Sequence, residues 1–443
     1  MPRSLRSTAT RVVSAALVAA TALTLSGCGG SSSGSSSNGV TTISFWDNNG
    51  GPTRTPYYQE LIKRFEAANP SIKVDYLGLP ADSVQQKYDT AIAGGGTPDI
   101  GGVQQSYVAG LIARNALEPI DDVADSATLK GNIDPKVLDT IRSTASDKKL
   151  YMLPVSVNLD ILWYRSDEFA AKKLTPPNTW DDFFTAAQAL TDPAANTFGF
   201  SIRGGAGGTQ ALLSIMYAYS GVQTSFDSSG KSTINDPKNV EAIEKIAALY
   251  GKETSKADVT NGYKEMSAEF DGGTAAMMVH NLGSYADHQK NLGAGKFAAE
   301  AMPAAPDGTR TLVANAPDGF AVFQASQHKA EAKKFLEFML SKDSNSYWNQ
   351  NVGQLPSNLQ AQKDAWVQAN PALKVGQTTL AASTTHIVDV PRYLPQYGSI
   401  VESQMGPKWQ QVLLGKLSAK DFADQWADLT TKAQADWVAK HPG

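Results

Sequence analysis

The side chains that most often catalyse reactions are present, but their spacing does not form a catalytic pattern. None of the five histidines has metal-ligand spacing to another histidine or to a cysteine; they are His280, His288, His328, His386 and His441. No Gly-x-Ser-x-Gly turn that presents a nucleophilic serine appears between a strand and a helix. Adjacent acids such as Asp121 and Asp122 point apart on a helix, whereas a glycoside hydrolase needs two carboxylates that face one bond. We therefore expect a protein that is not an enzyme and that holds no cofactor or metal.

The chain has one cysteine, and its position suggests its chemistry. Cys28 follows a basic N-terminal stretch and an apolar run over residues 12–25, which is too short to span a bilayer and is typical of a removable signal. The segment Leu25-Ser26-Gly27-Cys28 is similar to the bacterial lipobox, in which the thiol receives a diacylglycerol. We predict a lipoprotein signal peptide over residues 1–27 and lipidation at Cys28. The alternative is an ordinary secretion signal followed by a chance cysteine.

Residues 28–39 are almost entirely Gly and Ser after the cysteine, and this composition is typical of a flexible tether. By random-coil scaling such a segment spans roughly 15–20 Å. We therefore expect a protein that is exported and attached through its N-terminal lipid to the outer face of the cell membrane. Because Cys28 is the only cysteine, no internal disulfide is possible.

The composition is that of an ordinary globular protein, with 42% hydrophobic and 19% charged residues. A formal net charge of −4 argues against a nucleic-acid partner, which requires a basic surface. The chain that follows the tether is longer than one core usually supports, so two domains are expected.

The first part of the chain alternates strands and helices. Residues 43–45 and 72–76 alternate apolar and polar side chains, which predicts two strands. Residues 55–69 and 84–92 carry apolar side chains at helical spacing, with Thr55 as the expected N-cap of the first helix. This order predicts a parallel sheet with helices packed on its faces.

The rest of the chain repeats this pattern. An extended apolar run covers residues 151–164, and a capping-box-like start at Thr179 precedes a helix. Other strands are expected at 275–279 and 320–323. Further helices are expected at 212–219, 240–250, 332–339, 409–417 and 422–429.

Several stretches, taken together with their order, resemble one protein family over essentially the whole mature chain. They are Ile43–Trp46, Phe65–Pro70, Gly94–Ile100, Leu153–Pro154, Ile161–Tyr164, Pro176–Trp180, Phe270–Met277, Ala332–Phe335, Trp348 and Gly353–Pro356. The sequence resembles the extracellular family 1 solute-binding lipoproteins of sugar ABC importers, which are similar to maltose-binding protein.

The resemblance implies an α/β, two-lobed periplasmic-binding-protein-like fold. Each lobe would contain a mostly parallel sheet flanked by helices, and the ligand cleft would lie between the lobes. The N-terminal lobe would comprise residues 40–155 with 312–360, and the C-terminal lobe residues 156–311 with 361–443. In open α/β sheets ligands also bind where the loops at the carboxyl ends of strands converge.

A sugar presents hydroxyls, which pair with amides and carboxylates, and C–H patches, which aromatic faces cover. The loops expected near the cleft supply such side chains, and two arginines and two tyrosines follow in later segments. The candidate ligand-binding residues are Trp46, Asp47, Asn48, Asn49, Gln104, Gln105, Ser106, Asn158, Arg203, Gln210, His280, Asn281, Ser284, Tyr285, Asn315, Asp318, Arg392 and Tyr397, with Tyr393 beside the last two.

Each candidate also has a structural interpretation. Trp46 is equally consistent with a core position, and Asp47 and Asn48 with turn or cap positions. Asn158 is a better candidate, because a polar residue inside an apolar crossing needs a partner. Trp163 and Trp180 are interpreted as core residues. The Gly-rich loop at residues 204–208 is not a phosphate loop, because no Lys-Ser/Thr follows it.

The resemblance implies a monomeric protein that captures a small molecule, a sugar or oligosaccharide, by lobe closure and delivers it to the permease subunits of an ABC importer. Binding energy that is realised only when both lobes contact the ligand would favour the closed form. Two alternatives stay open. One is a binding protein for a peptide, a polyamine or another small polar solute, and the other is an extracellular lipoprotein glycoside hydrolase.

Overall fold

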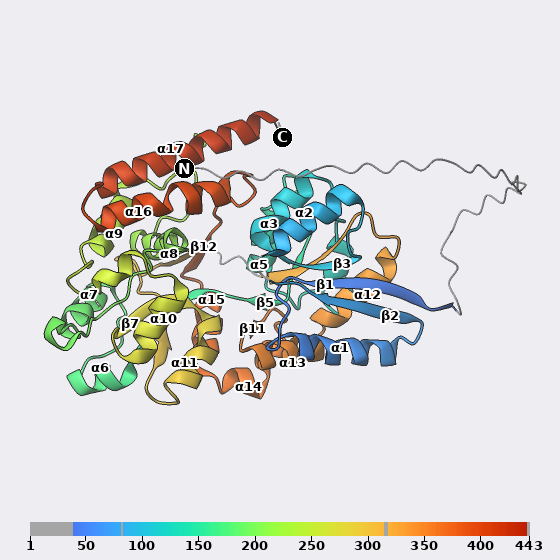
Figure 1. The fold of residues 1–443 in the computed structure, drawn as a ribbon, viewed down its shortest axis with the longest axis horizontal. Coiled ribbons are helices and arrows are strands. Elements are labelled where there is room, and N and C mark those ends of the chain that lie inside the picture. Colours follow the sequence, from blue (N-terminus) through green and yellow to red (C-terminus); the bar gives the residue numbers. More distant parts are fainter. Residues whose placement is uncertain (1–38, 81–82, 314–317, 441–443) are drawn as a thin grey trace, which may run out of the picture. The chain divides into compact units, whose positions relative to one another are not determined.

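The computed structural model describes residues 39–80, 83–313 and 318–440 (Figure 1). The predicted signal peptide, Cys28 and residues 29–38 of the tether lie outside the described residues, and so does Asn315. The chain from Val40 onward forms one compact unit, in which mixed sheets are flanked by helices. The predicted division of this unit into two lobes stays a prediction.

The largest sheet has five strands in the order β2-β1-β3-β10-β4. Their bounds are Thr41–Asp47 for β1, Ile72–Gly78 for β2, Ile100–Gln104 for β3, Leu153–Pro154 for β4 and Asp318–Val322 for β10. Strand β1 runs parallel to β2 and β3, as predicted. Its inward residues Ile43 and Phe45 are fully buried, which explains the alternation in the sequence.

The prediction of a mostly parallel sheet needs correction at its other edge, because β10 runs antiparallel to both β3 and β4. The chain leaves this sheet after Pro154 and returns at Asp318, and the Val155 amide donates to the Asp318 carbonyl oxygen at 3.1 Å. Because exit and return lie side by side at the same end of the sheet, the returning strand has to run in the opposite direction.

A second sheet has three strands in the order β7-β6-β8, and both pairings are antiparallel. Their bounds are Asp160–Tyr164 for β6, Met277–Asn281 for β7 and Ala298–Glu300 for β8. A mostly parallel sheet was therefore the wrong prediction here, although Phe198 and Ser201 form parallel bridges to Ala275 and Met278. A short, fully buried strand has the same apolar sequence in either direction, so the sequence does not encode its orientation.

Two short strand pairs complete the sheets. They are antiparallel β5 and β11, at Ser156–Val157 and Leu355–Pro356, and parallel β9 and β12, at Arg310–Val313 and Thr385–Val388.

The helices that accompany the first sheet bury apolar stripes. Tyr58, Leu61, Ile62 and Phe65 of α1 are buried, as predicted, but α1 starts at Thr55 itself and Arg54 occupies the N-cap position. Figure 1 shows α12 and α13 beside α1, which they contact. The bounds are Thr55–Ala68 for α1, Val84–Gly94 for α2, Gln105–Ala113 for α3, Asp121–Ala124 for α4, Pro135–Arg142 for α5, Lys329–Leu340 for α12 and Lys342–Val352 for α13.

Among the remaining helices, α8 and α10 contact β7, and α15 contacts β8. The capping box predicted at Thr179 is formed with Asp182 at the start of α7. The bounds are Ser166–Lys172 for α6, Trp180–Ala189 for α7, Gly208–Ser220 for α8, Pro237–Ala247 for α9, Tyr263–Gly272 for α10, Tyr285–Asn291 for α11, Ala365–Gln368 for α14, Pro371–Ala381 for α15, Gly406–Leu413 for α16 and Ala419–Lys440 for α17. Single turns lie at Pro193–Ala195, Lys256–Val259, Leu282–Ser284 and Ala361–Lys363, and a π-helical turn at Ser399–Gln404.

The buried apolar residues form two clusters. One cluster contains Phe45, Tyr58 and Trp348 and continues to Trp163 at 0% exposure. The other is built around α8, α9, α16 and α17 and contains Trp180, Trp409 and Trp426. Trp163 and Trp180 are therefore core residues, as interpreted from the sequence.

Candidate ligand-binding site

A cavity of about 720 Å³ is lined by side chains from segments far apart in the sequence. This volume lies within the range of pockets that bind small molecules. The lining includes Gln104, Asn158, Gln210, Asn281, Asp318, Arg392 and Tyr397 among the predicted residues. The structure thus brings together seven candidates from six separate stretches of the chain, since Arg392 and Tyr397 share one.

Strand pairing explains why several of these residues meet. Gln104 ends β3 and lies opposite Asp318, which starts β10. Asn281 ends β7 and lies opposite Asp160 of β6. Asn158 and Gln354 each adjoin the paired residues Val157 and Leu355 of the crossing between the two sheets. Strand ends and crossings therefore carry the polar side chains to one cavity.

Six neutral amide side chains lie on the cavity wall. They are Gln85, Gln104, Asn158, Gln210, Asn281 and Gln354. The Oδ1 atom of Asn158 is buried and has no hydrogen-bond partner among the described residues. Because buried polar atoms are nearly always paired, this oxygen is placed to accept a hydrogen bond from a ligand or a water molecule.

Hydroxyl groups supply further polar contacts on the wall. Tyr88 and Tyr107, together with Tyr397, also offer aromatic surface. The Tyr88 hydroxyl donates to the Gly102 carbonyl at 2.8 Å, which fixes the ring at the cavity edge. Burial raises the pKa of Tyr397, so its hydroxyl stays protonated. The serines of the wall are Ser156, Ser399 and Ser403.

The charged side chains of the wall lie near charges of opposite sign. Arg114 pairs with Asp89 at 2.5 Å, and Arg54 pairs with Asp318 at 3.4 Å. Arg392 is 9% exposed and lies near Asp160 and Asp389. Burial raises the pKa of both carboxyls, and the positive charge of Arg392 offsets part of that rise. The cavity therefore presents charges that the protein itself largely neutralises.

A smaller cavity of about 80 Å³ adjoins the first, because both are lined by Gln210, Asn281, Arg392 and Tyr397. Predicted residues Arg203 and His280 lie on its wall, together with Asp160 and Ser214.

His280 is fixed in this smaller cavity in its neutral form. Burial, with Arg203 and His288 nearby, lowers the pKa of His280 to about 3. Its Nδ1 hydrogen-bonds the Ser284 hydroxyl at 2.5 Å, and its ring stacks on Tyr263. A neutral imidazole can exchange hydrogen bonds with a ligand but adds no charge to the site.

Other predicted residues lie outside the lining of both cavities. Trp46 is half-buried, stacks on Tyr88 with ring centroids 5.8 Å apart and lies under the ammonium group of Lys87. Of the predicted residues Trp46, Asn158 and Asn281, the two asparagines line the main cavity and Trp46 does not. Tyr88, which packs on Trp46, reaches the cavity in its place.

Gln105, Ser284 and Tyr285 are held by contacts within the protein. Gln105 is fully buried and donates to the Thr140 carbonyl oxygen at 3.0 Å. Ser284 is fully buried beside His280, and the Tyr285 hydroxyl donates to Gln289 at 3.3 Å. The side chain of Ser106 and the whole of Asn315 lie outside the described part of the chain.

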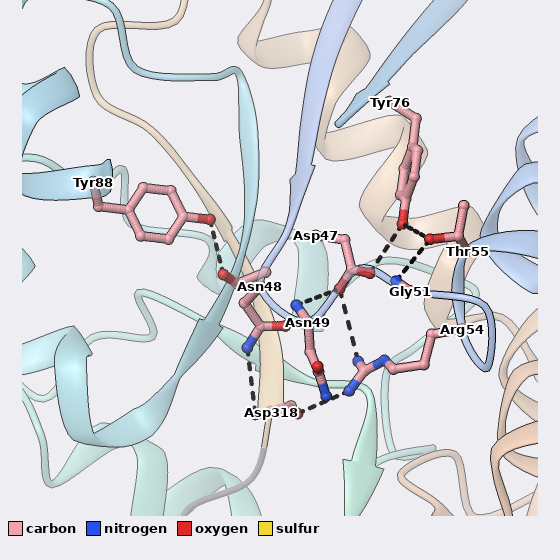
Figure 2. A network of polar contacts seen from close by, with 10 residues as sticks. Asp47, Asn48, Asn49, Gly51, Arg54, Thr55, Tyr76, Tyr88 and Asp318 are labelled. Atoms are coloured by element: carbon pink, nitrogen blue, oxygen red, sulfur yellow. Dashed lines mark hydrogen bonds and ion pairs between the residues drawn. The ribbon is translucent and has the colours of Figure 1, made fainter. Parts of the chain in front are cut away.

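Asp47, Asn48 and Asn49 belong to a polar network at the end of β1, which Figure 2 shows from close by. Asp47 is fully buried, and burial raises its pKa, whereas Arg54 and hydrogen bonds from Tyr76 and from the backbone of Asn49 lower it. Asn48 donates to Asp318 at 3.4 Å, so this network reaches the cavity wall through Asp318.

Sequence reasoning missed several wall residues. Gln85 and Tyr88 lie on α2, where the pattern indicated only a buried stripe, and Tyr107 lies on α3. Gln354 occurs in a stretch used for the family resemblance but was not assigned a ligand contact. Tyr393, by contrast, donates to Gln434 at 2.6 Å and packs near Trp437, and it does not line either cavity.

Metal-dependent catalysis and carboxylate-based catalysis each require a particular arrangement of side chains. No group of three metal-binding side chains occurs in residues 39–80, 83–313 or 318–440. The two carboxylates on the main cavity wall, Asp89 and Asp318, each contact an arginine. A helix with the length and hydrophobicity needed to cross a bilayer is also absent from these residues.

Two bacterial binding proteins are similar to this chain in sequence. The chain is 27% identical over 350 residues to a binding protein of Brucella abortus, an alignment that covers 77% of this chain and 80% of the relative. It is 26% identical to an ABC transporter periplasmic-binding protein of Escherichia coli, over 54% of this chain and 55% of the relative.

The fold is that of periplasmic binding proteins. The structure of the sugar-binding protein MalE from Xanthomonas citri matches with a TM-score of 0.77 at 20% identity, covering 91% of this chain and all of that one. Residues 49–346 match the family described as bacterial extracellular solute-binding protein, which confirms the predicted resemblance. The chain belongs to this family of bacterial extracellular solute-binding proteins, which are not enzymes.

Proposed function

We propose that this protein is the lipid-anchored substrate-binding protein of an ABC importer and that it captures an uncharged sugar or sugar alcohol in the cavity of about 720 Å³. The observation that carries the proposal is the chemistry of the wall. Six amides and several hydroxyls can each donate or accept, as sugar hydroxyls require, while the charged groups are paired within the protein.

The same observation disfavours charged ligands. A polyamine requires carboxylates that are not already paired with arginine, and Asp89 and Asp318 are both paired. An acidic ligand would require cations other than Arg392, which lies near Asp160 and Asp389. A neutral ligand needs no such compensation, because transfer of a charge into a half-buried cavity is costly without a partner.

Two findings support the role in transport. The relative from Escherichia coli is named as an ABC transporter periplasmic-binding protein, and the structural neighbour from Xanthomonas citri as a sugar-binding protein. We propose that the segments around β1–β3 and β6–β8 belong to two lobes that close on the ligand and that the closed form docks on a membrane permease. Cys28 would carry the lipid that keeps the protein near that permease.

The test is a thermal-shift screen of the mature protein against neutral mono- and oligosaccharides, mannitol, spermidine, amino acids and short peptides. The expected result is a rise in Tm with a neutral carbohydrate, since a ligand at 100 times its Kd stabilises by about 2.7 kcal/mol. A rise with spermidine or a peptide, and none with any carbohydrate, would contradict the proposal.

A further inference from the structure

Arg54 is a buried arginine that contacts the cavity wall without lining the cavity itself. It stands at the N-cap of α1, and its side chain is 11% exposed. One guanidinium nitrogen, Nη1, donates to Asp318 Oδ2 at 3.4 Å, and the other, Nη2, lies 3.8 Å from Asp47 Oδ1. Figure 2 shows the guanidinium between the two carboxylates.

Arg54 is itself held from two sides. Asp47 is fixed by hydrogen bonds from the Tyr76 hydroxyl at 3.0 Å and from the backbone N–H of Asn49 at 3.2 Å. The guanidinium also lies over the ring of Trp348, 5.0 Å from its centroid. A planar guanidinium with such neighbours has one preferred orientation, which a lysine would not reproduce.

Asp318 is the member of this network that reaches the ligand site. Its side chain is 22% exposed and lines the main cavity at the start of β10. Asn48 donates to Oδ1 and Arg54 to Oδ2, so each oxygen has one partner from the β1–α1 segment. A carboxylate has about four acceptor positions, and the contacts from the described residues occupy two of them.

The two carboxylates of the network differ in their exposure to the cavity. Asp47 and Asp318 share the guanidinium of Arg54. Asp47 is fully buried, whereas Asp318 is at the cavity surface. The Asp318 carboxylate is therefore the member of the network whose oxygens can accept hydrogen bonds from a ligand.

We infer that Arg54 is a positioning residue for ligand recognition, which orients the Asp318 carboxylate so that it accepts hydrogen bonds from hydroxyl groups of the ligand. The inference rests on the proposed function. Arg54 acts through Asp318 and does not contact the ligand, so its contribution to affinity exists only while Asp318 is present.

The test is a double-mutant cycle on the mature protein, with Arg54→Met, Asp318→Asn and the double variant. Affinity is measured by calorimetry with maltose, maltotriose and mannitol as the probes, and stability by urea unfolding. The matched control is Arg64→Met on the same helix, where the guanidinium pairs with Glu60 and lies over Tyr347.

The expected result is a loss of about tenfold in affinity for Arg54→Met, as for a hydrogen bond to a charged group, and little further loss when Asp318→Asn is already present. Arg64→Met should bind as the wild type does. An equal loss in both backgrounds, or no loss at all, would show that Arg54 is only structural.

Two further outcomes are informative. If Arg54→Met does not fold, the variant Asp47→Asn with Arg54→Met, which removes the carboxylate left without its cation, takes its place in the cycle. If the wild type binds none of these three probes and no other carbohydrate of the thermal-shift screen, the proposed function and this inference are rejected together. If the wild type binds one and the cycle shows no coupling, the inference alone is rejected.

Discussion

Replacement of Asn158 by Ala should weaken ligand binding without weakening the fold. Asn158 lines the main cavity, and its Oδ1 atom is buried with no partner in the described structure. A neutral hydrogen bond contributes about 0.5–1.5 kcal/mol net, so the Kd should rise by roughly three- to tenfold. Because an unpaired buried acceptor is unfavourable, its removal should leave the free energy of unfolding unchanged or raise it by up to about 1 kcal/mol.

The matched control is Asn349→Ala. The Asn349 amide is fully buried and donates to the carbonyl oxygens of Val155 and Asn345, at 3.0 and 2.8 Å. Its removal takes one hydrogen bond from each carbonyl, although Val155 keeps the bond from the Asn345 side chain at 2.8 Å, and should cost about 0.5–1.5 kcal/mol of stability. Calorimetry on the folded fraction should give an unchanged Kd. The reasoning is refuted if Asn158→Ala lowers the free energy of unfolding and binds carbohydrate as the wild type does.

Three further predictions concern export, autonomy and pH. Cys28→Ala should abolish incorporation of labelled palmitate, and normal labelling of that variant would reject the lipobox. A protein that begins at Val40 should fold and bind the same carbohydrate, because residues 40–443 form one compact unit; an unfolded circular dichroism spectrum would contradict this. Because the pKa of His280 falls from 6.5 to about 3 on folding, its contribution to stability is complete above pH 6.5 and is lost as the pH falls from 6.5 toward 3. In urea unfolding, the free energy of unfolding of the wild type should therefore fall by at most about 1.4 kcal/mol per pH unit between pH 6.5 and pH 5. The free energy of unfolding of His280→Gln should change less with pH over this range. Parallel pH profiles of the two proteins would contradict this assignment.

The sequence predicted the elements well because local patterns determine them. Alternation gave β1, with Ile43 and Phe45 buried, and the Thr179 capping box gave the start of α7. Strand direction was predicted only where parallel crossovers follow one another, in β1–β3. The antiparallel pairings of β6 and β10 depend on where the chain returns, which no local pattern records.

The candidate site was predicted in part for a similar reason. Gln104 and Asp318 lie at strand ends that meet at one edge of the first sheet, and Asn281 ends a strand of the second sheet. Trp46 was misplaced relative to the cavity wall because the sequence does not tell which neighbour covers an aromatic ring at a strand end. Tyr88 was overlooked because a tyrosine can be fully buried on a helix face and still contribute to a cavity edge.

The measurement that tests the central claim most directly is a crystal structure of the mature protein with the carbohydrate that gives the largest thermal shift. The account predicts one neutral ligand in the main cavity, with its hydroxyl groups hydrogen-bonded to Asn158, Asn281 and Asp318. A ligand bound elsewhere on the protein, or a charged ligand in this cavity paired directly with Asp318 or Arg392, would contradict it.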